Sequence, residues 1–176
     1  MEIYLIRHTT LNIESGICYG QSNIDVSDNF KKEVLAIKQK LPKNKKIKLY
    51  ASPLLRCYKL ASEISKTVFL DSRLKEINFG TWENKPWNSI PRSETDPWMA
   101  NFVFEKPPNG ESYLELQNRM IDFYSMLKKN YTQNESIIIV SHAGPIRALL
   151  SYLREIDLKD SFNIKIDYGQ IFKISH

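Results

Sequence analysis

The sequence predicts a three-layer α/β/α sandwich with a mostly parallel central sheet. Short apolar runs at 3–6, 47–51 and 137–140 have the length and composition of strands that are buried on both faces. Segments with helical spacing of apolar residues separate these runs. Strands that alternate with helices are typical of sheets covered on both faces. We expect residues 1–176 to form a single domain, since this length is enough for one core.

The first predicted strand ends at Ile6, directly before Arg7 and His8, and a loop rich in small and polar residues follows from 9 to 26. Ser27 is expected to cap a helix, because apolar residues then recur at helical spacing from Phe30 to Leu41. After the strand at 47–51, Ser52 and Pro53 suit the cap and the first position of a second helix that reaches residue 64. A short strand is predicted at 68–70.

The pattern breaks down between 78 and 110, a segment that holds all three tryptophans and most of the prolines. Long irregular segments in compact domains are usually lids or binding loops. The aromatic side chains suit equally a satellite cluster that packs over the sheet. The sequence leaves both interpretations open.

The regular pattern resumes at Ser112, which forms a capping box with Glu115 and predicts a long helix with an apolar stripe from Tyr113 to Leu127. A strand that ends at Ser141 follows, and then a helix over about 145–153. Two terminal pieces, 164–166 and 171–174, have strand-like composition.

Composition narrows the possible partners. The formal net charge is +5, and four lysines crowd the stretch 43–48 without interleaved aromatics, so we expect no nucleic-acid partner. No apolar run has the length of a membrane helix, and no signal peptide is visible, so we expect a cytoplasmic protein without a membrane partner. Cys18 and Cys57 lie in no C-x-x-C motif and are expected to be free thiols.

Polar groups follow the predicted strands where ligands bind in parallel sheets, at the carboxyl ends. Arg7 and His8 follow the first strand, His142 follows the strand that ends at Ser141, and the third histidine, His176, is the last residue. Arg56 lies about one turn into its helix and can lean back toward the same edge. The helix start after His142 offers free N–H groups to an anion.

Two arginines can bind phosphate oxygens in a bidentate manner, and Glu76 adds a carboxyl group that can donate a proton. This set comprises a nucleophile, an anion clamp and an acid, so we expect a small phosphorylated substrate. No His/Asp/Glu cluster has metal-ligand spacing, so we expect no metal and no cofactor.

These residues occur in segments that resemble the histidine phosphatase superfamily, also called phosphoglycerate-mutase-like. Five such segments follow one another in family order. They are Arg7-His8-Thr9, Ser52-Pro53-Leu54-Leu55-Arg56, the L-x-E-x-x-F-G-x-W-E block over 74–83, Gly110-Glu111-Ser112, and the segment from Ser141 to Arg147.

The resemblance implies a role for each matching position. His8 would accept the phosphoryl group as phosphohistidine. Arg7, Arg56 and His142 would hold the phosphate oxygens, with His142 also counted as catalytic. Glu76 would protonate the leaving oxygen and then assist water. Glu83 and Glu111 lie in matching segments too, and Glu76 is preferred as the acid.

The chain departs from the family pattern after His8, because Thr9 replaces the usual glycine and Asn12 cannot be equated with the family's asparagine. The segment Gly16-Ile17-Cys18-Tyr19-Gly20 instead looks like the α-ribazole phosphatase branch. We therefore expect Gly20 and Gln21 to lie in a substrate loop. The alternative is that the two glycines only shape a turn.

The favoured function is hydrolysis of a phosphomonoester through a phosphohistidine, with α-ribazole 5′-phosphate of cobalamin biosynthesis as the substrate. The alternatives are a broad-specificity sugar-phosphate or phosphoprotein phosphatase, a phosphoglycerate mutase, and a non-catalytic phosphate-binding module. The compact stretch between Gly80 and Gly110 argues against a mutase. We expect a monomer or a homodimer.

Overall fold

A computed structural model describes residues 1–43, 47–132 and 135–175, and confirms the predicted α/β fold. His176 and the lysines at 45 and 46 lie outside these ranges. The central sheet has five strands in the order β4-β3-β6-β1-β7, and β7 alone is antiparallel to its neighbour. The strands are β1 (Glu2–Arg7), β3 (Ile47–Ala51), β4 (Phe69–Leu70), β6 (Ser136–Ser141) and β7 (Ile171–Ser175).

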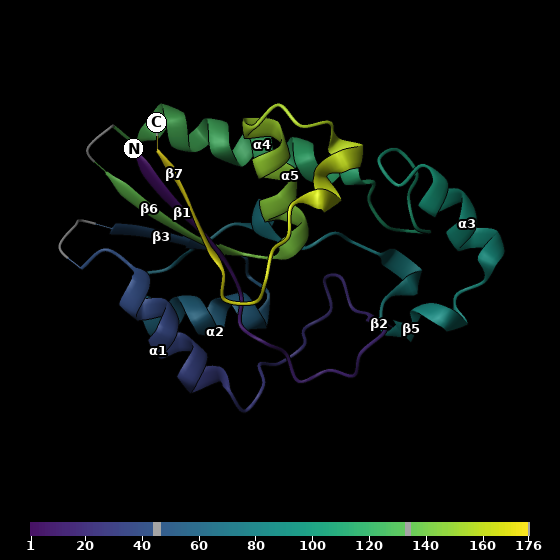
Figure 1. The fold of residues 1–176 in the computed structure, drawn as a ribbon, viewed down its shortest axis with the longest axis horizontal. Helices are drawn as coiled ribbons and strands as arrows, with labels where there is room; N and C mark the ends of the chain where they lie inside the picture. The colour runs from purple at the N-terminus through teal and green to yellow at the C-terminus, as the bar shows by residue number, and fades with distance from the viewer. Residues whose placement is uncertain (44–46, 133–134, 176) are drawn as a thin grey trace.

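Two helices cover each face of the sheet, as Figure 1 shows. One pair is α1 (Phe30–Lys40) and α2 (Leu55–Ile64), and the other is α4 (Tyr113–Asn130) and α5 (Ala143–Leu153). Side chains of a strand alternate between faces. Ile3 and Leu5 accordingly pack with α4 and α5, whereas Tyr4 and Ile6 pack with α1 and α2. This double burial explains why the strands are nearly continuous apolar runs.

Pairing between β1 and β6 aligns the two histidine-bearing strands. Their parallel register places Arg7 beside Ser141, so that His8 and His142 leave the sheet at the same edge. The backbone N–H of His8 also donates to the carbonyl of Ser141 at 3.0 Å. The register of two central strands therefore brings together residues that are far apart in the sequence.

Helix starts agree with prediction where the cap is local and differ where tertiary contacts compete. Ser112 and Glu115 form the predicted capping box at the start of α4. In contrast, α1 begins at Phe30 after Asn29, and the hydroxyl of Ser27 is buried without a hydrogen-bond partner. The prediction that Ser27 caps α1 is therefore wrong.

The Ser52-Pro53 cap is also wrong, because α2 begins at Leu55. The hydroxyl of Ser52 lies 2.8 Å from Nε2 of His142, so its closest partner is a residue at the carboxyl edge of the sheet. Helix α5 begins at Ala143, two residues before the predicted start. Pro145 is tolerated there because the first N–H groups of a helix have no intrahelical partner.

The predicted strand at 164–166 is absent from the structure. A 3₁₀ helix, η4 (Leu158–Asn163), precedes it, and the chain then runs irregularly to β7. Ile164 and Ile166 are buried, so the apolar pattern reflected burial and not sheet pairing. The carbonyl of Ile166 is used by Arg7, which donates to it at 2.8 Å.

The segment from 78 to 110 contains more regular structure than its sequence indicates. It holds the 3₁₀ turns η2 (Gly80–Trp82) and η3 (Trp87–Ser89), the strand β5 (Lys85–Pro86) and the helix α3 (Arg92–Ala100), and a further turn, η1 (Ser72–Leu74), precedes it. β5 pairs with β2 (Ile17–Cys18) as a two-stranded ribbon. Proline is strongly disfavoured inside helices, so the sequence around Pro97 did not predict α3.

The three tryptophans of this segment pack on one another. Ring centroids are 6.1 Å apart for Trp82 and Trp87, 5.6 Å for Trp82 and Trp98, and 6.0 Å for Trp87 and Trp98. Trp82 is buried in a small core with Cys18 and Ile90. In Figure 1 this lobe, with β2, β5 and α3, lies beyond the carboxyl ends of the strands.

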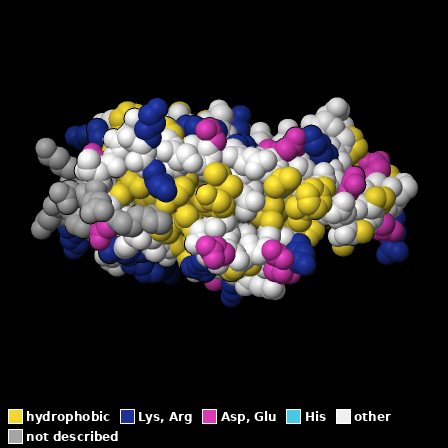
Figure 2. Space-filling model, turned by 90° about the horizontal axis from the view of Figure 1, so that it is seen from above, with side chains coloured by type: hydrophobic (Ala, Val, Ile, Leu, Met, Phe, Trp, Pro, Cys, Tyr) yellow, Lys and Arg dark blue, Asp and Glu magenta, His cyan; other side chains and the backbone are white. Residues whose placement is uncertain are grey.

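The surface on the side of α4 and α5 carries hydrophobic side chains along the middle of the face, with charged groups scattered around them (Figure 2). Phe162 of η4 is a large apolar side chain, and 56% of it is exposed to solvent. None of the helices in the described residues is long and apolar enough to span a membrane.

Candidate active site

His8 and His142 face each other at the carboxyl edge of the sheet. Their ring centroids are 5.2 Å apart and the rings are inclined at 63°. Both side chains are buried, with His8 only 1% exposed. The structure thus brings together the two internal histidines, as the strand-end positions predicted.

The tautomer of His8 follows from its hydrogen bond. Nδ1 lies 2.8 Å from the carbonyl oxygen of Thr9, and a carbonyl can only accept, so Nδ1 carries the proton. Burial, and next the charge of Arg56, lower the pKa of His8 well below its usual value, so the ring is neutral. Nε2 therefore holds an unprotonated lone pair, as a nucleophile requires.

His142 forms hydrogen bonds through both ring nitrogens. Nε of Arg56 donates to Nδ1 at 3.1 Å, which leaves Nε2 as the donor to Oγ of Ser52 at 2.8 Å. Burial lowers the pKa of His142, and the charge of Arg56 adds to this effect. A direct bond from His142 to phosphate requires one of these partners to be exchanged.

Arg56 is fully buried, and its two Nη atoms donate to backbone carbonyls. Its Nη1 donates to Ser22 at 2.7 Å, and its Nη2 donates to Gly20 at 2.6 Å. Within the described residues no carboxylate pairs with this guanidinium. A buried cation without a counter-ion is costly, so the site favours an incoming anion.

The guanidinium of Arg7 also donates to a backbone carbonyl, and its Nε–H group is available for a further hydrogen bond. Nη1 donates to Ile166, whereas Nε is buried and has no hydrogen-bond partner among the described residues. The hydroxyl of the neighbouring Thr9 is also buried and unpartnered. Unsatisfied buried donors cost about 1–3 kcal/mol each, and an oxyanion would relieve this cost at Arg7.

Glu76 lies against the first turn of α5. Its Oε1 accepts from the N–H of Ile77 at 3.0 Å and its Oε2 from the N–H of Gly144 at 3.4 Å. A Cβ atom at Gly144 would overlap Oε1, so glycine is needed for this approach. The side chain is 9% exposed, and the positive end of the helix dipole faces its carboxylate.

Gly20 and Gln21 lie beside this edge, but their contacts are with the protein. The carbonyl of Gly20 accepts from Arg56, and Nε2 of Gln21 donates to the backbone carbonyl of Glu76 at 2.9 Å. The N–H of Gln21 donates to Oε1 of Glu83 at 2.9 Å. The loop therefore holds Arg56 and Glu76 in place, whichever substrate is bound.

The other two acids of the matching segments have structural contacts. Glu83 also accepts from the N–H of Phe79 at 3.1 Å and from the hydroxyl of Ser22 at 2.7 Å. Glu111 pairs with Arg119 at 2.6 Å and accepts from the N–H of Asn78. Glu83 and Glu111 thus hold loops and Arg119 in place, whereas Glu76 is the carboxylate that accepts from Gly144 at the start of α5, two residues after His142.

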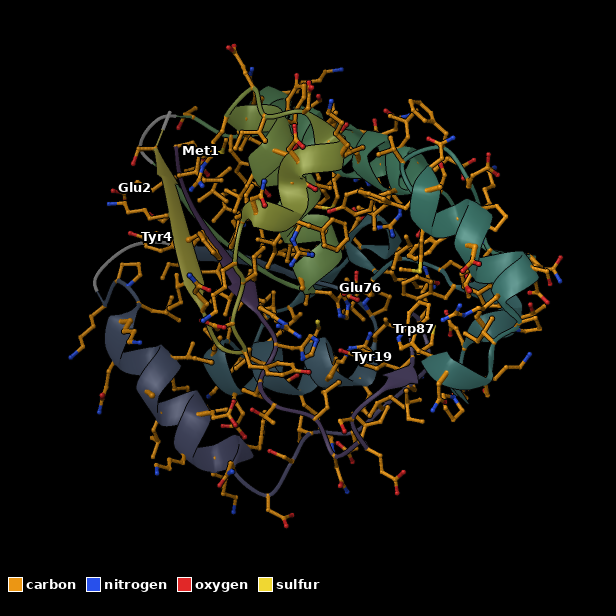
Figure 3. All side chains as sticks on the ribbon, turned by 45° about the vertical axis from the view of Figure 1, so that its right-hand side comes forward. Met1, Glu2, Tyr4, Tyr19, Glu76 and Trp87 are labelled. Carbon is orange, nitrogen blue, oxygen red and sulfur yellow. The ribbon has the colours of Figure 1, made fainter. Side chains whose placement is uncertain are left out.

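An open cavity of about 200 Å³ adjoins Glu76 and is walled mainly by aromatic side chains. Figure 3 shows Tyr19, Glu76 and Trp87 close together at this place, and all three line the cavity. The remaining lining residues are Ile17, Cys18, Gly20, Ile77, Phe79, Trp98, Phe102, Tyr113, Ala143, Gly144, Arg147 and Phe162. The segment from 78 to 110 is thus both a satellite cluster and a wall of the cavity.

Sequence reasoning missed three residues of this region. Ser52 was placed in a matching segment and interpreted as a cap, with no role at the site, although its hydroxyl lies 2.8 Å from Nε2 of His142. Arg147 lies in the last matching segment and lines the cavity, which a helical count from His142 could have suggested. Tyr168 lies over Arg7 with no sequence signal, because its position depends on a turn that folds back onto β1.

The fold and site together define an α/β protein with a neutral histidine near two arginines, neither of which pairs with a carboxylate in the part of the chain that the structure describes. Residues 3–176 match the family model of the histidine phosphatase superfamily (branch 1). The chain belongs to this superfamily, as its sequence segments predicted, and it is a phosphatase of that class.

Relatives and solved structures of several specificities are similar to the chain. A putative phosphoserine phosphatase 2 of Hydrogenobacter thermophilus is 32% identical, over 98% of this chain and 88% of the relative. A metal-independent phosphoserine phosphatase of Arabidopsis thaliana is 32% identical, over 87% of this chain and 68% of the relative. The crystal structure of the α-ribazole phosphatase from Shigella flexneri superposes with a TM-score of 0.90 at 21% identity, covering 99% and 90% of the two chains. That likeness shows the fold alone.

Proposed function

We propose that the protein hydrolyses small phosphomonoesters through a phosphohistidine at His8. The observation that carries this proposal is the neutral His8 ring, whose Nε2 is unprotonated, near two arginines that pair with no carboxylate among the described residues. Nε2 attacks phosphorus, and the bond from phosphorus to the ester oxygen breaks. Arg7 and Arg56 balance the charge that develops on the phosphoryl oxygens.

Glu76 completes the two half-reactions as the proton carrier. In its protonated form it gives a proton to the leaving oxygen, and the alcohol departs from the aromatic cavity. The resulting carboxylate then takes a proton from water, which attacks the phosphohistidine and releases inorganic phosphate. His8 and Glu76 return to their starting states, so the cycle is balanced.

The protein's own cations supply the charge that a metal ion would otherwise provide, so we propose a metal-independent reaction. Incubation with a chelator should leave kcat/KM unchanged. A loss of activity that a divalent ion restores would contradict this part of the mechanism.

The favoured substrate is α-ribazole 5′-phosphate, which would place the enzyme in cobalamin biosynthesis. The cavity beside Glu76 has walls of Tyr19, Trp87 and Trp98. Aromatic faces of this kind stack well on the flat aromatic ring that the departing alcohol carries. Ile17, Cys18, Tyr19 and Gly20 form part of this wall, and they belong to the Gly16 to Gly20 segment that resembles the α-ribazole phosphatase branch.

A second candidate substrate is phosphoserine, which the curated relatives at 32% identity favour. Arg147 supports it, because this cavity-lining cation has the carbonyl of Ile164 and the ring of Phe162 as neighbours but no carboxylate partner in the described residues. It would pair with the carboxylate of phosphoserine.

The two candidates separate in a comparison of kcat/KM. The panel contains α-ribazole 5′-phosphate, phosphoserine, sugar phosphates, phosphoglycerates, nucleotides and a phosphopeptide. A preference of about a hundredfold, or about 2.7 kcal/mol in transition-state binding, would identify the substrate.

Arg147→Gln should reduce turnover of phosphoserine far more than that of α-ribazole 5′-phosphate. A flat profile would favour a broad-specificity phosphatase, and mutase activity on phosphoglycerates would contradict the hydrolase assignment.

A further inference from the structure

Each of the two arginines at the site faces the ring of a tyrosine. The guanidinium carbon of Arg7 lies 3.7 Å from the ring centroid of Tyr168, and that of Arg56 lies 5.3 Å from the centroid of Tyr19. The ring of Tyr168 is also 5.5 Å from the ring of His8. Cation–π contacts are effective within about 6 Å, so both pairs are in range.

The two tyrosines also meet each other. Burial raises the pKa of Tyr19, and the nearby hydroxyl of Tyr168 adds to this effect. The side chains thus connect Arg7, Tyr168, Tyr19 and Arg56 in a continuous arc next to His8. Tyr168 is 39% exposed, so it forms the outer part of this arc.

Tyr168 reaches the site because its turn is fastened to β1 at several points. Arg7 donates through its N–H to Gln170 at 3.1 Å, and the N–H of Gly169 donates to the carbonyl of His8 at 3.1 Å. Gly169 has a φ of +66°, which allows this turn. Nη1 of Arg7 adds its bond to Ile166, so the turn and the arginine fix one another.

We propose that Tyr19 and Tyr168 form a tyrosine clasp that positions the guanidinium groups of Arg7 and Arg56 around the phosphoryl group bound at His8. This inference rests on the proposed function. The ring of Tyr168 covers one face of the planar Arg7 group and leaves its edge, including the unpartnered Nε, to bind oxygen. Tyr168 is thus a positioning residue for Arg7, and Tyr19 holds the corresponding place beside Arg56.

The test uses orthovanadate and inorganic phosphate as probes of the phosphoryl site, because neither depends on the identity of the natural ester. Their inhibition constants are measured in competition with p-nitrophenyl phosphate. Tyr168→Leu should weaken vanadate binding and lower kcat/KM by about tenfold, or about 1.4 kcal/mol, since it removes the ring from Arg7. Tyr168→Phe keeps the ring and should restore most of this loss.

Two controls distinguish a loss of arginine positioning from a general loss of folded structure. Tyr152→Leu removes a tyrosine that is 48% exposed on α5 and should change neither constant. Tyr19→Phe and Tyr168→Phe each remove one side of the hydroxyl contact, so the double variant should lose no more than the worse single variant. Additive losses in this cycle would overturn the contact, and the cycle remains decisive if Tyr168→Leu fails to fold.

The outcomes for clasp and phosphatase are distinct. Failure of the wild-type protein to bind vanadate or to form acid-labile phosphate would contradict the proposed function itself. Wild-type binding with equal vanadate affinity in Tyr168→Leu would overturn the clasp and leave the phosphatase intact.

Discussion

Gly144→Ala is the substitution that most directly tests the role of Glu76. The new methyl group would overlap Oε1 of Glu76 and force the carboxyl group away from α5. The substitution leaves the neighbouring Ala143 and Pro145 unchanged. Overpacking of this kind costs about 1–3 kcal/mol. Replacement of a helical glycine by alanine contributes about 0.5–1 kcal/mol in the opposite direction. We therefore expect a net destabilisation of about 0–2.5 kcal/mol, so the variant should remain folded.

The effect on activity should be larger and should depend on the leaving group. A displaced general acid costs about 10²–10⁴ in rate when the departing alcohol needs a proton. An alkyl phosphate should therefore lose about a hundredfold or more in kcat/KM, whereas p-nitrophenyl phosphate should lose little, because nitrophenolate departs without protonation. Glu76→Gln should show the same selectivity.

Steady-state kinetics with both esters, together with thermal unfolding, would decide the matter. Gly16→Ala is a useful control, because no atom lies within 4 Å of a Cβ placed at Gly16, although its φ of +82° adds local strain. Equal losses on the two esters in Gly144→Ala would refute the reasoning, and so would full activity on the alkyl phosphate.

Three further predictions concern the histidines and cysteines. His8→Ala should abolish turnover and acid-labile phosphate, and activity close to wild type would rule out a phosphohistidine. Because burial lowers the pKa of His8 and His142, the unfolded chain binds more protons below about pH 6.5, so unfolding free energy should fall as pH falls below that value. His8→Asn should flatten this slope in denaturant titrations, and an unchanged slope would count against a neutral His8. Burial raises the pKa of the Cys18 and Cys57 thiols, so both should resist a thiol reagent until the protein is denatured, and rapid labelling of the native protein would contradict this burial.

The strands, the long helix and the family were predictable because their signals are local. Continuous apolar runs mark β1 and β6, and the Ser112–Glu115 capping box depends on residues three positions apart. Arg7 is the last residue of β1, and His8 and His142 directly follow β1 and β6, so the parallel register had to bring them to one edge. A location in the cytoplasm and a monomeric or dimeric state stay predictions from the sequence.

Other features were decided only by tertiary structure, because the competing partners are distant in sequence. Ser52 has a cap-like position, yet His142 takes its hydroxyl, since strands β3 and β6 are neighbours in the sheet. Helix α3 forms in spite of Pro97, as its lobe packs around the tryptophans. The arc from Arg7 through Tyr168 joins opposite ends of the chain. Local patterns report contacts within a turn or along a strand, whereas the order of strands in the sheet determines which distant side chains meet.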